Sequence, residues 1–425
     1  MRTIVLGAGV IGITTAYYLA KDGHEVVVVE RQAEAAAETS YANAGLIAPG
    51  HSFTWNSPRA PKLLLQSLWR RDLSYRMHFS LDPHFWIWGM KFLLSCSAAT
   101  ARANTLVKLG LCRYSQAKLE EIAAAEGLDY HQYKKGLLFF YRDPAHFAQG
   151  VANMELMQSQ GQTIEVIDAK RAVEIEPALK PIEGKLAGAV YCPGDGSGDC
   201  RKFTLQLAAV CKKLGVRFEY GRQIRGFETA GGRVSAVATD GGAVSGDAYV
   251  LSLGSYSSIL ARSAGFGLPV YPVKGFSLTL PIDPALSPTV GGVDEGALVA
   301  YCGMGDRLRM TATADFSGYD ASHKPEDFAT MMAVARELFP KGVDFSRPSY
   351  WACLRPMTPD GPPIVGRSPL ANLWLNTGQG HMGWTMAAGS SRVLADLMAG
   401  RRSEHLVDGL GFERFSANGR GRRAA

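Results

Sequence analysis

Cysteine is scarce in this sequence, and its few positions are scattered. The chain has seven cysteines among 425 residues, and no two of them form a Cys-x-x-Cys pair. Disulfide frameworks and structural zinc sites both need cysteines at closer or more regular spacing. The sequence therefore predicts free thiols in a reducing compartment, and it predicts no metal site.

Long apolar runs are also absent. No stretch reaches the roughly 18 consecutive apolar residues that a membrane-spanning helix needs. The first residues belong to a predicted strand rather than to an apolar leader with a cleavage site, so we expect no signal peptide. Both observations predict a cytoplasmic protein.

A strong charge of either sign is missing as well. The 45 basic and 39 acidic residues give a formal charge of +6, and three of the arginines lie in the last six residues. No basic stretch is interleaved with aromatic residues, so we exclude a nucleic-acid partner. With 47% hydrophobic and 20% charged residues, a chain of this length is typical of a globular protein with two domains.

The first 30 residues predict a unit that binds a dinucleotide. A short apolar strand over 4–6 leads into Gly7-Ala8-Gly9-Val10-Ile11-Gly12, then an apolar helix over 13–20 and a strand over 25–29 that ends at Glu30. Glycines at this spacing permit a tight turn, a close approach of backbone to a pyrophosphate and close packing of helix on strand. The helix N-terminus attracts the pyrophosphate, and Glu30 stands where a carboxylate binds ribose hydroxyls. This stretch alone leaves NAD and FAD open.

The segment after Glu30 is small, polar and glycine-bearing. Residues 39–50 are Thr-Ser-Tyr-Ala-Asn-Ala-Gly-Leu-Ile-Ala-Pro-Gly, a composition that lets backbone lie close against a ligand. Because it directly follows the acidic end of the predicted half-site, we expect it to continue the nucleotide site. A surface loop is the alternative.

Helices are predicted from about 52 to 133. The most apolar of them covers 85–94, Phe-Trp-Ile-Trp-Gly-Met-Lys-Phe-Leu-Leu. Ten residues are too few to span a bilayer, so we expect a helix of the core. An interfacial helix is the alternative, because tryptophan and nearby basic residues suit a lipid headgroup region. These basic residues are Arg70, Arg71, Arg76 and Lys91.

Strands dominate the rest of the chain. They are predicted at 136–141, 188–191, 216–220, 224–244, 247–253, 272–280, 296–301 and 307–313. A second strand–glycine–helix unit follows at 373–398, where Gln379-Gly380-His381-Met382-Gly383-Trp384 opens the helix. The sheet-rich block before it carries no nucleotide pattern, and we assign it to substrate binding.

Five motifs in this order resemble those of the bacterial D-amino-acid dehydrogenases, in the D-amino-acid oxidase superfamily. They are GAGVIG with Glu30, residues 40–45 (Ser-Tyr-Ala-Asn-Ala-Gly), 272–275 (Pro-Val-Lys-Gly), 354–361 (Leu-Arg-Pro-Met-Thr-Pro-Asp-Gly) and 380–386 (Gly-His-Met-Gly-Trp-Thr-Met). The resemblance implies an α/β fold in which a discontinuous Rossmann-like FAD-binding domain carries an inserted α+β substrate-binding domain. We expect residues 1–55, 186–260 and 350–415 in the FAD-binding domain, and 56–185 and 261–349 in the substrate-binding domain.

The same resemblance implies non-covalently bound FAD. The three glycines of the opening turn are expected at the pyrophosphate, Glu30 at the adenosine ribose, and residues 44–45 and 380–383 beside the isoalloxazine ring. The complete set of expected cofactor-binding residues is Gly7, Gly9, Val10, Ile11, Gly12, Glu30, Arg31, Ser40, Asn43, Ala44, Gly45, Leu46, Gly254, Gly380, His381, Met382, Gly383 and Trp384.

Four residues are the candidates for the substrate site. Arg355 matches the family arginine that binds the substrate carboxylate, a role that suits the planar guanidinium fork; a structural salt bridge is the alternative. Tyr271 and Arg309 are expected in the pocket wall, and His51 follows the flavin loop. Cys353 lies near the position where relatives that oxidise N-methyl amino acids attach flavin. The Arg-Pro after it is the dehydrogenase pattern, so we expect a buried inert thiol.

The resemblance implies oxidative deamination of D-amino acids to 2-oxo acids and ammonia. It also implies a quinone or another respiratory-chain acceptor, and hence peripheral contact with the inner face of the cell membrane. Three alternatives stay open. They are a dehydrogenase of a cyclic imino acid such as D-proline or hydroxy-D-proline, an oxygen-using oxidase of the same superfamily, and a flavin- or nucleotide-binding protein without amine chemistry.

Overall fold

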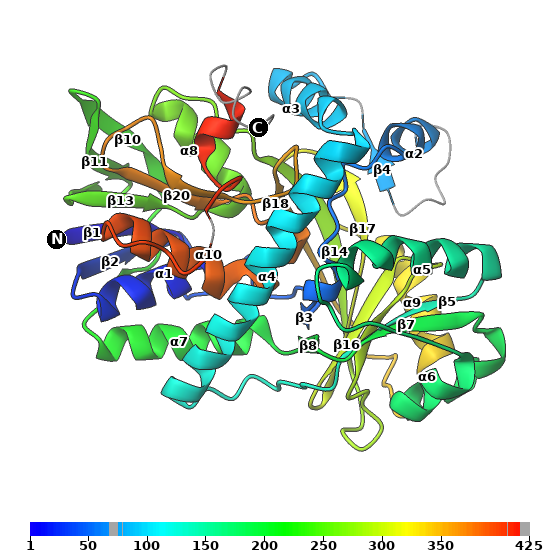
Figure 1. Cartoon of the computed structure of the whole chain (residues 1–425). Coiled ribbons are helices and arrows are strands. Elements are labelled where there is room, and N and C mark those ends of the chain that lie inside the picture. Colours follow the sequence, from blue (N-terminus) through cyan, green and yellow to red (C-terminus); the bar gives the residue numbers. More distant parts are fainter. Residues whose placement is uncertain (68–74, 79, 406, 417–425) are drawn as a thin grey trace.

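Two large β-sheets lie side by side and make up most of the molecule (Figure 1). The structure is a computed structural model, and it describes residues 1–67, 75–78, 80–405 and 407–416. A six-stranded sheet lies on the side of the N-terminus and a nine-stranded sheet on the other side. Within the described residues, a three-stranded sheet and a two-stranded ribbon complete the β-structure.

The six-stranded sheet has the strand order β19–β20–β13–β1–β2–β9. Its neighbours pair in parallel, except that β19 runs antiparallel to β20. The strands are β1 (Arg2–Leu6), β2 (Glu25–Val29), β9 (Arg217–Glu219), β13 (Ala248–Leu251), β19 (Ile364–Arg367) and β20 (Leu373–Thr377). The runs Ile-Val-Leu in β1 and Val-Val-Val-Val in β2 are apolar on both sides because both faces of the sheet are covered.

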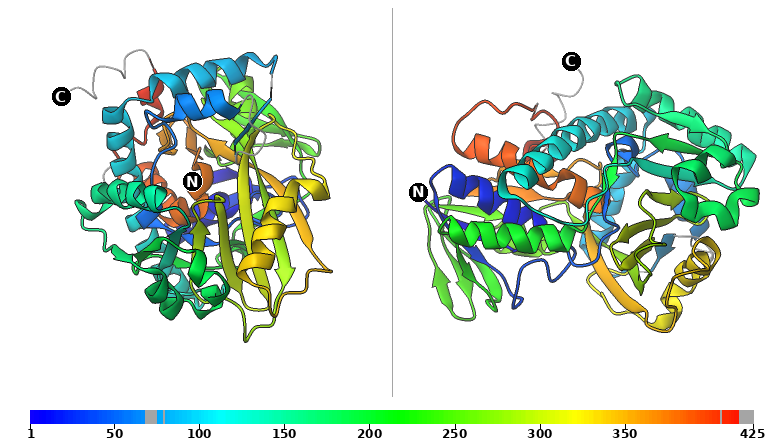
Figure 2. Two further views of the ribbon diagram at one scale, coloured as in Figure 1. Left: turned by 90° about the vertical axis from the view of Figure 1, so that its right-hand side faces the viewer. Right: turned by 90° about the horizontal axis from the view of Figure 1, so that it is seen from below.

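Helices cover one face of this sheet, and a small sheet covers the other (Figure 2). Val5 and Val28 point into a core shared with α1 (Val10–Lys21), α7 (Cys200–Lys213) and α10 (Gly383–Met398). Ile4 and Val27, which alternate with them, point to the opposite side. That side is closed by β10 (Ile224–Ala230), β11 (Arg233–Thr239), β12 (Gly242–Val244) and α8 (Ser257–Ser263). The predicted dinucleotide-binding fold is confirmed.

The nine-stranded sheet has the order β18–β14–β17–β16–β15–β5–β7–β6, and β4 pairs with β17 outside this path. In chain order its strands are β4 (Tyr75–Met77), β5 (Leu137–Tyr141), β6 (Glu165–Ile167), β7 (Gly188–Cys192), β14 (Tyr271–Pro281), β15 (Gly291–Asp294), β16 (Val299–Met304), β17 (Arg307–Phe316) and β18 (Ser349–Met357). One face packs on α6 (Ala169–Ile175), α9 (Ala329–Leu338) and the 3₁₀ turn η2 (Pro177–Lys185).

The remaining elements are short or lie outside the two large sheets. They are the ribbon β3 (Leu46–Ile47) with β8 (Gly196–Ser197), the helices α2 (Ala60–Ser67), α3 (Pro83–Leu94), α4 (Ala98–Glu126) and α5 (Pro144–Gln158), and the 3₁₀ turns η1 (Pro49–His51), η3 (Gly254–Tyr256), η4 (Pro325–Phe328), η5 (Gly380–Met382) and η6 (Phe412–Phe415). The 29-residue α4 packs along α10 and crosses the front of the molecule in Figure 1.

Two strands depart from the predicted division into domains. β7 and β18 belong to the nine-stranded sheet, although they fall in the segments 186–260 and 350–415 that we expect in the FAD-binding domain. The reason is continuous hydrogen bonding, because β7 pairs with β5 and β6, and β18 pairs with β14 from Tyr271 to Thr279. Helix α4, from the segment 56–185, packs instead on α10.

The apolar segment 85–94 forms most of α3, and it has two different faces. Phe85, Trp88 and Phe92 are buried against the end of β14, as a core helix requires. The opposite face, which we name the α3 face, is exposed and apolar; its residues are Trp86, Ile87, Met90, Leu93 and Leu94. Arg70 and Arg71 lie outside the described residues. No helix that the structure describes combines the length and hydropathy of a transmembrane segment.

Candidate active site

An elongated cavity of about 640 Å³ lies between the two large sheets. One end lies beyond the carboxyl ends of β1, β2 and β13, where Gly7, Glu30 and Ser252 follow the strands. In sheets of parallel strands, ligands bind at this edge. The other end is floored by the nine-stranded sheet, which contributes Thr313 and Arg355 among other residues.

The glycine turn presents bare backbone to the first end of the cavity. Gly7 has a φ of +100°, and a Cβ there would lie 2.8 Å from the carbonyl oxygen of Ser252. Beside it, the N–H of Val10 at the start of α1 donates a 3.0 Å hydrogen bond to the hydroxyl oxygen of Ser40. The first turn of α1 holds no acidic residue, and its residues Val10 and Ile11 line the cavity, so the positive end of the helix faces the cavity.

Glu30 faces the same end of the cavity from the tip of β2. Its carboxylate accepts hydrogen bonds from the N–H groups of Ala8 (2.8 Å) and Gln32 (2.9 Å), which fix its position. Burial raises the pKa of Glu30, and these two hydrogen bonds oppose that shift. Arg31 also lines the cavity, and its guanidinium lies 4.0 Å above the ring of Tyr256.

Two segments far apart in the sequence meet at the middle of the cavity. Residues 42–46 and 379–385 both line it, as we expect for a wall beside the isoalloxazine ring. The amide oxygen of Asn43 accepts a 3.0 Å hydrogen bond from the N–H of Gly45, which holds the first segment in its turn. Every predicted cofactor residue except Gly12 lines this cavity.

Gly12 has a different place. It lies in α1 where the helix crosses the end of β1, and a Cβ there would overlap the carbonyl oxygen of Gly7. The absence of a side chain at Gly12 lets α1 pack closely on the turn at Gly7, on the side away from the cavity. The bare turn, the N-terminus of α1, Glu30 and the two small-residue segments together fit FAD.

Arg355, which we expect to bind the substrate carboxylate, lies in the floor of the cavity. It projects from β18 across Gly275, where a Cβ would lie 2.5 Å from the Arg355 Cζ. Its Nη1 donates a 2.7 Å hydrogen bond to the carbonyl oxygen of Thr313 on β17. Burial lowers the pKa of Arg355, and the described groups that act on its charge are Cys353 and Tyr75 rather than a carboxylate. A guanidinium stays charged in such surroundings and presents its fork to an anion.

A β-bulge aims the carbonyl group that holds Arg355. The pairing of β14 with β17 shifts between Lys274 and Phe276. Thr313, at this irregularity, has a φ of +65°, which is rare for a β-branched residue. Bulges beside active sites redirect single groups, and strained backbone gathers there. The strain at Thr313 therefore supports a functional role for the floor around Arg355.

An aromatic wall stands beside the flavin segments. The rings of Trp55 and His381 stack with centroids 5.0 Å apart, and Tyr75 meets Trp55 edge-on at 5.9 Å. Burial, with the nearby charge of Lys108, lowers the pKa of His381 well below its ordinary value, so the imidazole is neutral. Lys108 of α4 is itself buried and donates a 2.8 Å hydrogen bond to the carbonyl oxygen of Phe53. Burial lowers the pKa of Lys108 to about 8.

His51 lies in the cavity wall together with an acidic residue. Its Nε2 atom is 3.1 Å from Oε1 of Glu295, and its ring stacks on Phe139 with centroids 4.6 Å apart. All three side chains belong to the cavity lining.

Two predicted substrate residues lie elsewhere. Tyr271 is 1% exposed and packs among Phe85 and Trp88 beneath α3. Arg309 is 5% exposed, and its Nη1 donates a 3.0 Å hydrogen bond to the carbonyl oxygen of Asn43. Neither belongs to the cavity lining. Tyr271 supports the position of α3, and Arg309 holds the flavin segment from behind.

Sequence reasoning missed the wall residues Trp55, Tyr75, Phe139 and Glu295. Glu295 was detectable in part, because an acidic residue directly after a buried strand stands at a sheet edge, but β15 is short and rich in glycine. Cys353 also lines the cavity. Burial raises the pKa of this thiol, so it is a neutral group, in keeping with the predicted non-covalent flavin.

Comparisons with known proteins agree with this geometry. The family described as FAD dependent oxidoreductase (DAO) matches residues 2–397. The D-amino acid dehydrogenase 2 of Mesorhizobium japonicum is 47% identical over 96% of this chain and 99% of that protein. The D-amino acid dehydrogenase of Paramagnetospirillum magneticum is 43% identical over 98% of this chain and 99% of that protein.

Solved structures show the same fold at low sequence identity. The glycine oxidase of Geobacillus kaustophilus has a TM-score of 0.73 and 22% identity, over 96% of this chain and 98% of that one. The L-proline dehydrogenase of P. horikoshii has a TM-score of 0.75 and 18% identity, over 97% of each chain. The family match covers most of the sequence, and the cavity has the residues that FAD needs. The chain belongs to the FAD-dependent oxidoreductase (DAO) family.

Proposed function

We propose that this protein oxidises D-amino acids to 2-oxo acids and ammonia with FAD, and that a membrane quinone takes up the electrons. The observation that supports the substrate class best is the half-buried Arg355 guanidinium in the floor of the FAD cavity. A single fixed cation beside a flavin suits a substrate with a carboxylate next to the reacting carbon. The names of the similar dehydrogenases support the same substrate class.

The residues of this chain would position the substrate and exclude water. Arg355 binds the α-carboxylate, and the bulge at Thr313 holds the guanidinium in place. The wall of Trp55, Tyr75 and neutral His381 shields the reacting carbon. FAD, when bound, accepts the hydride that leaves Cα. Loss of that hydride and of one proton from nitrogen leaves an imine, which water hydrolyses to the 2-oxo acid and ammonia.

Anaerobic bleaching of the purified yellow protein tests the substrate class. A panel of D-amino acids, their L-enantiomers and cyclic imino acids is added, and the loss of flavin absorbance is followed. We expect rapid bleaching by acyclic D-amino acids only. Faster bleaching by D-proline or hydroxy-D-proline would favour the imino-acid alternative. A yellow protein that none of them bleaches would contradict amine chemistry altogether.

The same preparation tests the acceptor. We expect reduction of a short-tailed ubiquinone analogue with D-alanine, and little hydrogen peroxide in air. Rapid peroxide release without quinone reduction would make the protein an oxidase. The solved relatives include both oxidases and dehydrogenases, so the fold does not decide between these acceptors.

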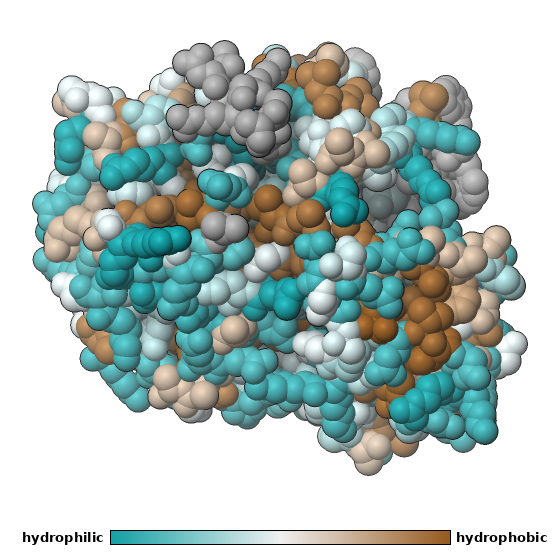
Figure 3. All heavy atoms as spheres, in the orientation of Figure 1, coloured by the Kyte–Doolittle hydropathy of each residue, from teal (hydrophilic) through white to brown (hydrophobic). Residues whose placement is uncertain are grey.

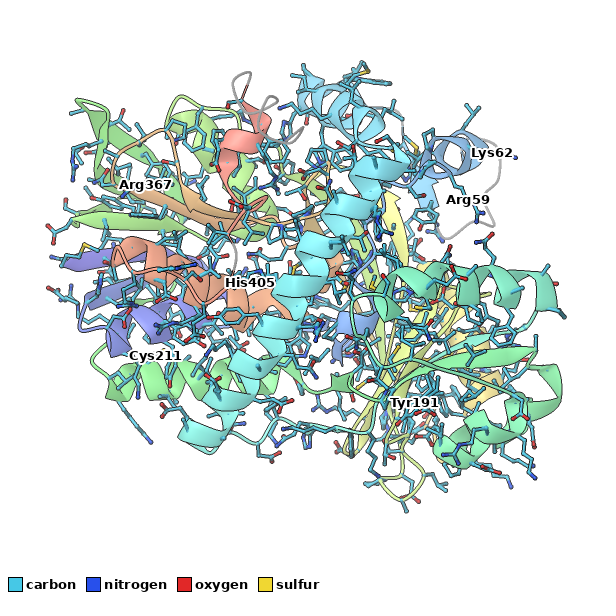
Figure 4. The ribbon with its side chains drawn as sticks, viewed as in Figure 1. Arg59, Lys62, Tyr191, Cys211, Arg367 and His405 are labelled. Atoms are coloured by element: carbon cyan, nitrogen blue, oxygen red, sulfur yellow. The ribbon has the colours of Figure 1, made fainter. Side chains whose placement is uncertain are left out.

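The exposed α3 face supports the proposed contact with a lipid surface. Its five apolar side chains are between 47% and 69% exposed. Figure 3 shows hydrophobic residues at the top of the molecule, where Figure 1 places α3. Figure 4 places Arg59 and Lys62, at and near the start of α2, on the same side of the molecule. An exposed apolar helix face with tryptophan and basic neighbours is typical of helices that lie in a membrane interface.

Flotation with lipid vesicles tests this contact. We expect binding to vesicles that contain phosphatidylglycerol and weaker binding to phosphatidylcholine alone. The triple change Trp86→Ser/Ile87→Ser/Met90→Ser removes much of the apolar area and should lower binding by about 10-fold or more. The matched control is Val166→Ser/Leu214→Ser/Leu286→Ser, which alters exposed apolar residues elsewhere. Equal loss in both variants, or no binding by the native protein, would contradict the proposal.

A further inference from the structure

Glu295 is an acidic side chain in the wall of an otherwise apolar part of the cavity. It follows β15, and its N–H donates a 3.0 Å hydrogen bond to the carbonyl oxygen of Phe140, which fixes the backbone at this point. The side chain is 11% exposed. A carboxylate that is so far removed from water is stable only when other groups compensate its charge.

The described residues compensate this charge incompletely. Oε1 of Glu295 lies 3.1 Å from Nε2 of His51 but makes no hydrogen bond to any described residue. A carboxylate has room for about four hydrogen bonds. His51 is held by its stacking on Phe139, so the pair is a fixed feature of the wall. A ligand with hydrogen-bond donors and a positive charge would complete the set.

Glu295 stands well away from the guanidinium that receives the carboxylate. Arg355 reaches Thr313 on β17, whereas Glu295 follows β15, and β16 lies between these two strands. Two strand spacings separate β17 and β15 by roughly 10 Å. The α-amine of an amino acid is adjacent to its carboxylate and stays beside Arg355. The end of a long side chain, by contrast, crosses the floor toward Glu295.

Tyr75 is close enough to both Arg355 and Glu295 for each charge to affect its pKa. Burial raises the pKa of Tyr75; the charge of Glu295 raises it further, and the charge of Arg355 lowers it. Tyr75, Glu295 and Arg355 all line the same cavity, so both charged groups border one continuous space. That space has a cation at one end and an anion at the other.

We propose that Glu295, oriented by His51, forms the distal end of the substrate cavity and selects D-amino acids whose side chain ends in an amine or a guanidinium. This inference deepens the proposed function and depends on it. Glu295 determines the preferred side chain, while Arg355 receives the group that all substrates share.

D-Lysine and D-norleucine provide the test, because their side chains have equal numbers of carbons and differ in the terminal amine. We expect the native holoenzyme to have a higher kcat/KM for D-lysine. In Glu295→Gln the carboxylate becomes a neutral amide of the same shape, so the D-lysine value should fall about 10- to 100-fold, and the D-norleucine value should stay within about 3-fold. Glu228→Gln, the same change at an exposed position of β10, should leave both values unchanged.

Three results would overturn the inference. One is a native enzyme that does not prefer D-lysine, and a second is a Glu295→Gln variant that keeps the native preference. The third is an equal fall for both substrates, which would assign Glu295 to general positioning or proton transfer. All three leave oxidation of D-amino acids intact. Failure of the native protein to oxidise either substrate, or D-alanine, would instead contradict the proposed function itself. Flavin absorbance of each variant confirms that the holoenzyme has formed.

Discussion

Replacement of Arg355 by alanine is expected to lower kcat/KM for D-amino acids by roughly 30- to 1,000-fold. The reason is the loss of a charge that pairs with the substrate carboxylate in the cavity floor, and truncation of one partner of such a pair typically costs about 2 to 4 kcal/mol. If Arg355 binds the carboxylate as strongly in the enzyme–substrate complex as in the transition state, most of the loss should appear as a higher KM. Steady-state kinetics with a dye acceptor, together with binding of a carboxylate inhibitor, measures the effect.

Two control variants make the Arg355 result interpretable. Arg355→Lys keeps the charge but lacks the planar fork, so it should recover part of the activity. Arg233→Ala, at an exposed position of β11, should have native kinetics. Native FAD content in Arg355→Ala would show that the cavity persists. An Arg355→Ala enzyme with native kcat/KM would make this guanidinium a structural group and remove the main support for a carboxylate substrate.

Replacement of Gly12 by alanine is expected to destabilise the protein by about 3 kcal/mol or more and to abolish FAD binding. The added Cβ would overlap the carbonyl oxygen of Gly7, and both groups belong to packed backbone that cannot move aside. Urea unfolding and the flavin absorbance of the purified protein measure the two effects.

Gly89→Ala is the matched control for Gly12→Ala. Both glycines lie inside helices, but a Cβ at Gly89 would meet no atom within 4 Å. Alanine favours a helix interior over glycine by about 0.5 to 1 kcal/mol, so Gly89→Ala should be slightly stabilising and fully yellow. A Gly12→Ala protein with native stability and flavin would refute the close packing of α1 on β1.

The residues that the sequence assigns to the cofactor lie together at the cavity, with Gly12 behind the turn, because the pattern that predicts them is local. Gly7, Gly9 and Glu30 lie within one strand–helix–strand unit, and backbone groups carry most of the expected contacts. The segment 379–385 was predictable for the same reason, since it joins β20 directly to α10. In both places a short pattern fixes where the backbone comes close to a ligand.

The substrate half was harder because distant strands assemble it. Alternation along a strand shows which face a side chain occupies, but it does not show how much of that face the cavity covers. Tyr271 shares the alternation of Gly275 on β14, yet α3 covers it. The bulge at Thr313 breaks the alternation of β17, so that residues 311–314 all reach the cavity while Arg309 stays outside.

The strand order of the six-stranded sheet also has a consequence for synthesis on the ribosome. β1 is made first, but its partner β13 begins at Ala248, and β20 begins only at Leu373. At about 5–20 residues per second, roughly 12 to 50 s pass before β13 can cover the open side of β1. During that time the growing polypeptide exposes an unpaired apolar strand edge. We therefore expect nascent polypeptides that end before residue 248 to occupy chaperones, and FAD to bind only after almost the whole protein has been made.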